Sequence, residues 1–371
     1  ALVALVALVL RLYKVDGQSL WYDEGFSVYL AHMDPAEIVA RTAADIQPPL
    51  YYLLLHGWIQ IFGEGEAAVR SLSVLWAVLA VPLIYVLAGE LFHSRLAGLL
   101  VALLLAVSPL HLWYGQEARM YSLLTFLCLL SGILLLLAMR AKGWVSAVVL
   151  WLGYALTGVA AVYTHYFAFF VLAFQAAYLL LVTWSEGFRR WRTLLGGLVA
   201  GLVTLLAYLP WLPHLLTRYG TDASYLPGRL KLGEVLVDIL VAFAGGESVL
   251  EGTGVLLAAG YGLILALCLA ALLAVAARAD RRAEASAWRL PPAYHPLLFL
   301  LLYLLLPVAL ILAVSFASPK FNARYAMISH PALLLLLAGG LAALWGRRTG
   351  ALGSVGRGAG AALALLLRLV E

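Results

Sequence analysis

Residues 297–312 read LLFLLLYLLLPVALIL, a run without one charged side chain, and 96–107 read LAGLLVALLLAV in the same manner. Such runs recur along the chain. Of its 371 residues, 64% are apolar and 12% are charged, whereas soluble domains carry roughly 25% charged residues. With a mean hydropathy of +0.98, the chain has too few polar side chains to cover soluble domains. These features predict a protein whose main solvent is lipid.

Helical runs of about 20 apolar residues can cross a bilayer. We expect nine such spans, at about 68–91, 95–110, 119–139, 144–163, 166–184, 193–213, 254–277, 295–315 and 326–346. Partial runs at 1–10 and 359–370 raise the expected total to about 11, and we interpret the chain as truncated at both ends. The first run lacks the basic start and the cleavage site of a signal peptide. We therefore predict an all-α polytopic membrane protein with a single transmembrane domain, residues 1–371.

The few charges sort the loops into two sides. Twelve basic residues fall in alternate short loops: Arg95, Arg140, Lys142, Arg189, Arg190, Arg192, Arg278, Arg281, Arg282, Arg289, Arg347 and Arg348. Loops rich in Lys and Arg face the cytoplasm. The opposite, outer side then holds 14 of the 19 acidic residues, mostly in the long loops 13–67 and 214–253. The net charge of +5 is therefore mostly topological, and nucleic acid is not an expected partner.

The segment from Pro48 to Phe62 is apolar and helical in pattern but short, at roughly 15 residues. If it crossed the membrane, residues 13–47 would lie on the same side as the basic loops. We therefore expect a re-entrant or interfacial helix on the outer side, within the first outer loop.

That loop contains the sequence SLWYDEGFS at residues 19–27, with the adjacent carboxylates Asp23 and Glu24. Neighbouring carboxylates repel one another, so one of them should have a raised pKa unless a cation is near, and this suits a general base. The alternative is a helix that begins at Asp23, where acidic side chains complement the helix dipole.

Three further motifs lie at outer helix ends: QPPLYY at 47–52, SPLHLWYGQEARMY at 108–121 and YTHY at 163–166. Glu117, Arg119 and Tyr121 begin a span, and the helix N-terminus together with Arg119 could bind an anion. An interfacial ion pair and an aromatic belt are the alternatives. His165 could ligate a metal with Glu117 or Asp23, or be held by an ordinary hydrogen bond.

Residues 318–325 read SPKFNARY and join two spans on the outer side. Lys320 and Arg324 lie there against the positive-inside tendency. A phosphate group would explain both, because Arg binds it through a planar fork and Lys as a point charge. The alternative is contact with lipid headgroups.

Together, WYDE at 21–24, QPPLYY at 47–52, YGQEARMY at 114–121 and NARY at 322–325 resemble the GT-C superfamily of integral-membrane glycosyltransferases. They are most similar to its bacterial branch related to protein O-mannosyltransferases and lipid A aminoarabinose transferase. The resemblance implies a bundle of about 11 transmembrane helices with juxtamembrane helices on the outer face. One of these would lie in the first outer loop and another at Leu230 to Phe243.

The resemblance also implies a reaction, in which a sugar moves with inversion from a polyprenyl phosphate to an acceptor hydroxyl on the outer face of the cytoplasmic membrane. Asp23 would be the base, with Glu24 as its helper or as a group that positions the acceptor. The donor phosphate would be bound by Arg324, Lys320 and Arg119. Substrate contacts are expected from Glu117, Tyr121, Gln47, His165, Tyr325 and Tyr22.

The implied partners are the lipid-linked donor, membrane lipid and an acceptor that is a cell-envelope glycan, a lipid or a protein. No cofactor is obligatory for a monophosphate donor, and a divalent metal at Glu117 and His165 is the alternative. The His-Pro-Pro of the mannosyltransferases is Gln47-Pro48-Pro49 here, which weakens the case for a protein acceptor.

The main alternative to an enzyme is a transporter or flippase of a polyprenyl-linked intermediate. Such proteins place ionisable residues at mid-membrane, on discontinuous helices that face a central path. Here the centres of the spans are nearly free of charge. This distribution favours the transferase.

Overall fold

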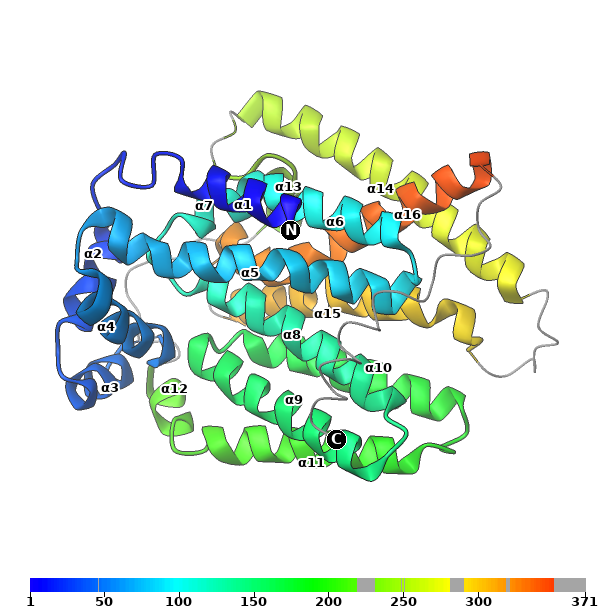
Figure 1. Cartoon of the computed structure of the whole chain (residues 1–371), viewed down its shortest axis with the longest axis horizontal. Coiled ribbons are helices and arrows are strands. Elements are labelled where there is room, and N and C mark those ends of the chain that lie inside the picture. The colour runs from blue at the N-terminus through cyan, green and yellow to red at the C-terminus, as the bar shows by residue number, and fades with distance from the viewer. Residues whose placement is uncertain are drawn as a thin grey trace.

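The computed structural model describes residues 1–45, 47–218, 231–247, 249, 251–280, 290–317 and 321–349, and the ordered elements in these ranges are all helical (Figure 1). In chain order they are α1 (Leu2–Leu12), α2 (Tyr22–Ala31), α3 (Pro35–Ala43), α4 (Leu50–Phe62), α5 (Glu66–Phe92), α6 (Arg95–Val107), α7 (Pro109–Gly115), α8 (Tyr121–Arg140), α9 (Trp144–Thr164), α10 (Ala168–Ser185), α11 (Trp191–Tyr208), α12 (Leu212–Arg218), α13 (Leu232–Gly245), α14 (Glu251–Asp280), η1 (Pro292–Tyr294), α15 (His295–Ala317), η2 (Ala323–Ser329) and α16 (His330–Thr349). The predicted all-α fold is confirmed.

Eight helical segments in the described ranges are long and apolar enough to cross a membrane, and nine if the bent pair α6 and α7 forms one span. Each corresponds to one of the nine apolar runs found in the sequence. Helix α1 has 11 residues and is shorter than these spans. The closing run, 359–370, lies outside the described residues, so the total of about 11 stays a prediction.

Helices α2, α3 and α4 gather at one end of the bundle, at the left of Figure 1, where α4 packs against both α2 and α3. We call this the motif end. The opposite end, where α8 ends at Arg140 and α11 begins at Trp191, is called the basic end. Helix α4 has 13 residues, fewer than the candidate spans, and stops at Gly63, whose φ of +84° suits glycine. The juxtamembrane helix expected from Leu230 corresponds to α13, and Leu230 itself lies outside the described residues.

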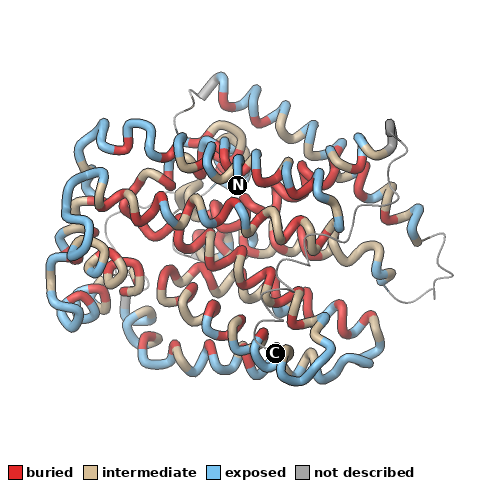
Figure 2. Tube along the Cα trace, viewed as in Figure 1, coloured by how far each residue is buried: buried red, intermediate tan, exposed pale blue. Residues whose placement is uncertain are grey.

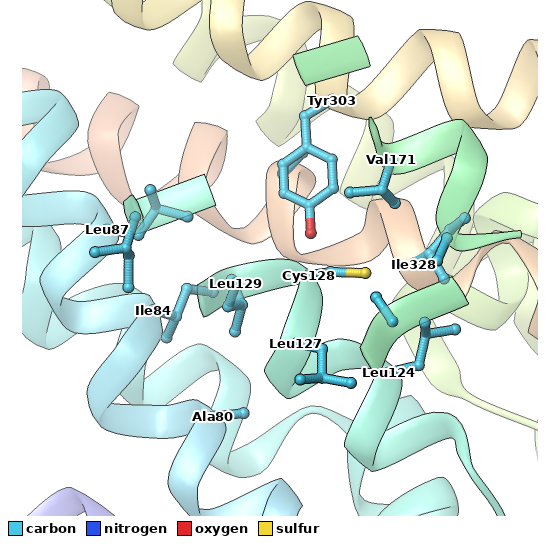
Figure 3. Packing of buried hydrophobic residues seen from close by; sticks show 14 of the residues in the cluster. Ala80, Ile84, Leu87, Leu124, Leu127, Cys128, Leu129, Val171, Tyr303 and Ile328 are labelled. Atoms are coloured by element: carbon cyan, nitrogen blue, oxygen red, sulfur yellow. The ribbon is translucent and has the colours of Figure 1, made fainter. Parts of the chain in front are cut away.

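The core follows the long axis of the bundle around α5, which packs most extensively against α8 and α6 (Figure 2). Figure 3 shows part of this core, where Ile84 of α5 lies beside Leu129 of α8 and the ring of Tyr303 points toward Cys128. These side chains are close-packed and apolar, as in other helix bundles. The core therefore gives the motif end a rigid base.

The break between α6 and α7 bends the chain by 57° at Ser108 and Pro109. Proline has no N–H, so the carbonyl of Leu105 loses its helical partner. The buried guanidinium of Arg11, on α1, replaces it by donating to the carbonyl oxygens of Leu105 at 3.2 Å and Ala106 at 3.0 Å. Beyond the bend, α7 turns the motif at 114–121 toward α2.

Candidate active site

The site begins at the N-terminus of α2, whose first turn contains Asp23 and Glu24. The backbone N–H of Trp21, the N-cap residue, donates to Oε2 of Glu24 at 3.3 Å. Consecutive residues of a helix point about 100° apart around its axis. The two carboxylates therefore enter different surroundings, although they are neighbours in sequence.

Glu24 is fully buried and hydrogen-bonded at both oxygens. Arg70, on α5, donates from Nε to Oε1 at 2.8 Å and from Nη2 to Oε2 at 2.7 Å, and the backbone N–H of Ala118 donates to Oε1 at 2.9 Å. Arg70 also donates to the carbonyl oxygens of Val15 at 2.7 Å and Gln18 at 2.8 Å. We call Glu24, Arg70 and the two backbone donors the Glu24 cluster. It joins α2, α5 and two loops, as buried bidentate pairs can do.

Asp23 has a looser environment. Its Oδ2 lies 3.6 Å from Nη1 of Arg324 and 3.8 Å from Nη2 of Arg119, and 23% of the side chain is exposed. Both distances are too long for direct hydrogen bonds, so the ion pairs of Asp23 are loose. We call these three residues the Asp23 cluster. It places a partly accessible carboxylate beside two cations.

The two cations, Arg119 and Arg324, are far apart in the sequence, and different neighbours hold each of them in place. Arg119 is buried, and its Nη1 donates to the carbonyl oxygen of Asp23 at 3.3 Å, to Oγ of Ser27 at 3.4 Å and to the hydroxyl of Tyr52 at 3.5 Å. Arg324 lies at the start of η2, where the side chain of Asn322 accepts the backbone N–H of Arg324 at 3.0 Å. Two guanidiniums converging on one partly open point form a site for an anion such as phosphate.

Tyr121, the first residue of α8, is the aromatic wall beside these cations. The guanidinium of Arg324 lies 5.9 Å from the ring centre of Tyr121 and 5.8 Å from that of Tyr325, within the range of cation–π contacts. Tyr325 also packs edge-on against Phe167 at 5.3 Å. The structure thus brings Arg119, Tyr121, Arg324 and Tyr325 to one place.

Glu117 lies in the turn between α7 and α8 and is nearly buried. Burial, followed by the nearby charge of Glu24, raises the pKa of Glu117 to about 7, although Arg324 and Arg119 oppose the shift. Its Oε2 has no hydrogen-bond partner among the described residues. A carboxyl group with such a pKa can accept or hold a proton near neutral pH.

A cavity of about 740 Å³ opens at this end of the bundle. Its wall includes Glu117, Arg324, Trp113, Asn322 and Glu247, and Glu247 accepts a hydrogen bond from the hydroxyl of Tyr114 at 2.7 Å. Asp23 is not part of this wall, but Arg324 touches both the cavity and Asp23. A cavity of this size is in the range that holds small ligands such as a sugar.

The other predicted site residues lie at different distances from this centre. His165 is buried, its Nδ1 accepts the backbone N–H of Phe167 at 3.1 Å, and its ring centre lies 6.4 Å from that of Tyr121. Burial and the two arginines lower the pKa of His165 to about 3, so the ring is neutral. Tyr22 is 85% exposed at the edge of the motif end, and Oε1 of Gln47 is buried without a hydrogen-bond partner in the described structure. Lys320 lies outside the described residues.

Sequence reasoning missed Arg70, Tyr52, Ser27, Asn322 and Glu247 as parts of the site. Arg70 lies inside the apolar run 68–91, which the sequence predicts to be a span. A charged residue inside such a run indicates a buried partner, and this is the signal by which Arg70 could have been found. Tyr52 and Asn322 belong to motifs already noted, but their roles depend on contacts between distant segments. No group of three His, Cys, Asp or Glu side chains in the described ranges is arranged to hold a metal ion.

Comparisons with known proteins show what the chain resembles in sequence and in fold. The profile of the family described as dolichyl-phosphate-mannose-protein mannosyltransferase matches residues 46–214. The undecaprenyl phosphate-alpha-4-amino-4-deoxy-L-arabinose arabinosyl transferase of Pseudomonas paraeruginosa (strain DSM 24068 / PA7) is 36% identical over 166 residues, which are 44% of this chain and 29% of that protein.

Among solved structures, ArnT from Cupriavidus metallidurans in the apo state is similar with a TM-score of 0.61 and 17% identity, over 94% of this chain and 60% of that one. The same protein bound to undecaprenyl phosphate gives 0.59 with 18% identity, over 94% and 61%. The oligosaccharyltransferase AglB from Archaeoglobus fulgidus, in complex with an inhibitory peptide and a dolichol-phosphate, gives 0.60 with 16% identity, over 99% and 53%. The chain spans less than two thirds of each of these proteins, and the likeness establishes a shared fold.

Proposed function

We propose that this chain is a member of the GT-C superfamily and an inverting glycosyltransferase. It would move a sugar from a polyprenyl phosphate to an acceptor hydroxyl of a cell-envelope glycan, a lipid or a protein. The observation that carries the proposal is the Asp23 cluster, a carboxylate beside two guanidiniums, one of which, Arg324, also lines the cavity. The carrier lipids named with the structures of ArnT and AglB support the donor class.

The chemistry divides between the members of this cluster. Asp23 takes the proton of the acceptor hydroxyl. At the same time the oxygen of that hydroxyl forms a bond to the anomeric carbon, and the bond from this carbon to the phosphate oxygen breaks. Arg324 and Arg119 bind the phosphate of the donor and stabilise the charge that develops as polyprenyl phosphate leaves. No carboxylate becomes attached to the sugar.

The long distances from Asp23 to the two arginines suit an exchange of partners. When the donor phosphate enters, the guanidiniums pair with it, and Asp23 becomes available to the acceptor. Glu24 stays in its own cluster and acts as a positioning residue that fixes the first turn of α2. Glu117, at the wall of the cavity, orients the sugar or the acceptor through a hydrogen bond.

The proposed location is the outer face of the cytoplasmic membrane. The support is the charge pattern, because the basic residues collect at the opposite end of the bundle. A lipid-linked donor also fits a chain that consists mainly of membrane helices, since the tail stays in lipid while the sugar reaches water.

The test is transfer by the purified protein in nanodiscs, supplied with a panel of polyprenyl-phosphate sugars, with released polyprenyl phosphate as the readout. Wild type should release it from at least one donor, and Asp23→Asn should not. Asp16→Asn, an exposed carboxylate in the same loop, is the matched control and should behave as wild type. Normal turnover by Asp23→Asn would overturn the assignment of the base. Movement of intact donor across the bilayer without release would favour the flippase.

A further inference from the structure

The basic end of the bundle holds a second cavity, of about 600 Å³, whose wall includes Arg140, at the end of α8 opposite to Tyr121. Two loops form it, the one between α8 and α9 and the one between α10 and α11. They are joined by a hydrogen bond from Nη1 of Arg190 to the carbonyl oxygen of Met139 at 3.4 Å. Its wall carries five cationic side chains, Arg140, Lys142, Arg189, Arg190 and Arg192.

Only part of this positive charge is balanced within the described residues. Arg140 pairs with Glu90 at 2.7 Å and Arg190 with Glu186 at 3.0 Å. Lys142, Arg189 and Arg192 form no ion pair with a described carboxylate. The positive-inside tendency explains the presence of basic loops, but it does not require two of them to converge on one cavity.

The surroundings place this cavity at the depth of lipid headgroups. Trp191 lines it, Trp144 begins α9 and Trp184 lies in the last turn of α10, and these side chains are 57%, 80% and 67% exposed. Exposed tryptophans at the ends of membrane helices lie at the boundary between the hydrocarbon and the headgroups. The unbalanced cations therefore face the phosphates of the leaflet rather than bulk water.

A smaller, apolar cavity of about 250 Å³ is lined by residues of α8 and α11, the helices that also contribute to the basic cavity. On α8, Leu135 lines the apolar cavity, and Met139, one turn later, lines the basic cavity. On α11, Leu194 lines the apolar cavity and its neighbour Thr193 lines the basic one. The apolar cavity continues along one face of α11 past Gly201 to Leu205. From Thr193 to Leu205 is about 18 Å of helix, close to the roughly 15 Å of one hydrocarbon leaflet.

We propose that the two cavities form one binding site for an anionic, phosphate-bearing diacyl phospholipid of the leaflet at the basic end. The headgroup phosphate would pair with Lys142, Arg189 and Arg192, and one acyl chain would fill the groove along Gly201. This ligand is separate from the lipid-linked donor, whose phosphate is assigned to the motif end. The site would hold α8 to α11 together from the side that the charge pattern predicts to be cytoplasmic.

The test measures lipid retention by native mass spectrometry, so it does not depend on the transfer reaction. The protein is exchanged into detergent with phosphatidylglycerol or phosphatidylethanolamine of identical acyl chains. Wild type should retain phosphatidylglycerol in preference. The triple variant Lys142→Gln/Arg189→Gln/Arg192→Gln should lose roughly 100-fold of that retention, since each basic residue near an anionic surface contributes about a factor of five.

A matched control removes cations of the same end that do not line the cavity, in Arg95→Gln/Arg278→Gln, and should retain phosphatidylglycerol as wild type does. If this control loses the lipid as the triple variant does, the effect is a general surface charge and the proposal fails. Equal retention by the triple variant and wild type would also overturn it. So would displacement of the lipid by inorganic phosphate alone, or preferential retention of polyprenyl phosphate through the same three residues.

The acyl groove has a separate test that changes no charge. A Cβ at Gly201 would meet no atom within 4 Å, so Gly201→Leu should be accommodated and should fill the groove. We expect it to reduce retention of phosphatidylglycerol by roughly tenfold. Gly260→Leu, on α14, has equal space and lies outside both cavities, so it should have no effect. Wild-type retention by Gly201→Leu would show that the groove does not hold the chain.

Discussion

Asp23 and Glu24 are adjacent in sequence and have opposite surroundings. Glu24 is buried and accepts short hydrogen bonds from Arg70 and from two backbone N–H groups, with distances of 2.7 to 3.3 Å. Asp23 is partly exposed and stands 3.6 and 3.8 Å from its two arginines. A saturated carboxylate has no free acceptor for a substrate, whereas a loosely paired one can exchange partners. Glu24 therefore stabilises the fold around α2, whereas Asp23 stays available to react with a substrate.

The sharpest test of this division is the pair of isosteric variants Asp23→Asn and Glu24→Gln. Loss of a general base reduces rates by roughly 10²- to 10⁴-fold, so Asp23→Asn should lose transfer activity by a factor in this range, while its thermal unfolding midpoint falls less than that of Glu24→Gln. Glu24→Gln should lose stability. The transfer rate and the unfolding midpoint are measured on the same preparations of both variants. If the two variants lose rate and stability to the same extent, Asp23 and Glu24 do not have separate roles.

A second test breaks the Glu24 cluster outright. Removing one partner of a buried ion pair leaves the other charge uncompensated, at a cost of about 3–5 kcal/mol. Arg70→Ala and Glu24→Ala should therefore both lower the free energy of unfolding by this amount, and the double variant should lose less than the sum of the two. Thermal or chemical unfolding in detergent measures it. Additive losses in the double mutant would show that the two side chains do not interact.

The third prediction concerns the looser pair at Asp23. Arg324→Ala should lower kcat/KM for the polyprenyl-phosphate donor by roughly a hundredfold, because it removes a guanidinium from the phosphate and a charged hydrogen bond of about 1.5–3 kcal/mol. Arg324→Lys should recover part of this loss by keeping the charge without the planar fork. Arg41→Ala, an exposed arginine of α3, is the control. Unchanged donor affinity in Arg324→Ala would instead assign this residue to lipid headgroups.

The smallest expected effect is a pH dependence due to Glu117. Its pKa of about 7 in the folded chain exceeds the roughly 4.3 of an unfolded glutamate. Between these values the folded state binds the proton more tightly than the unfolded state does, so stability should fall as the pH rises through this range and level off above about pH 7. Glu117→Gln should flatten the unfolding midpoint between pH 5 and pH 8, and Glu37→Gln should not. An unchanged slope in Glu117→Gln would place the effect elsewhere.

The sequence identified much of the site because its motifs are local. The peptides around Asp23, Glu117 and Arg324 each lie at a helix end that the apolar runs define, and alternation of spans predicts that they share one side. The partner of Glu24 could not be found in this way. Arg70 lies inside an apolar run, 46 residues away along the chain, and its contact with Glu24 depends on where the first turn of α2 lies relative to α5.

By itself, then, the sequence determined a helical membrane bundle with its acidic motifs at one end and its basic loops at the other. The physical reason is that lipid offers no hydrogen-bond partners, so each apolar run must satisfy its backbone within a helix, and charges must collect at the ends. Only the tertiary structure decided which carboxylate is bound tightly and which stays available. That outcome depends on distances among α2, α5, the 116–120 turn and η2, and packing rather than local sequence sets those distances.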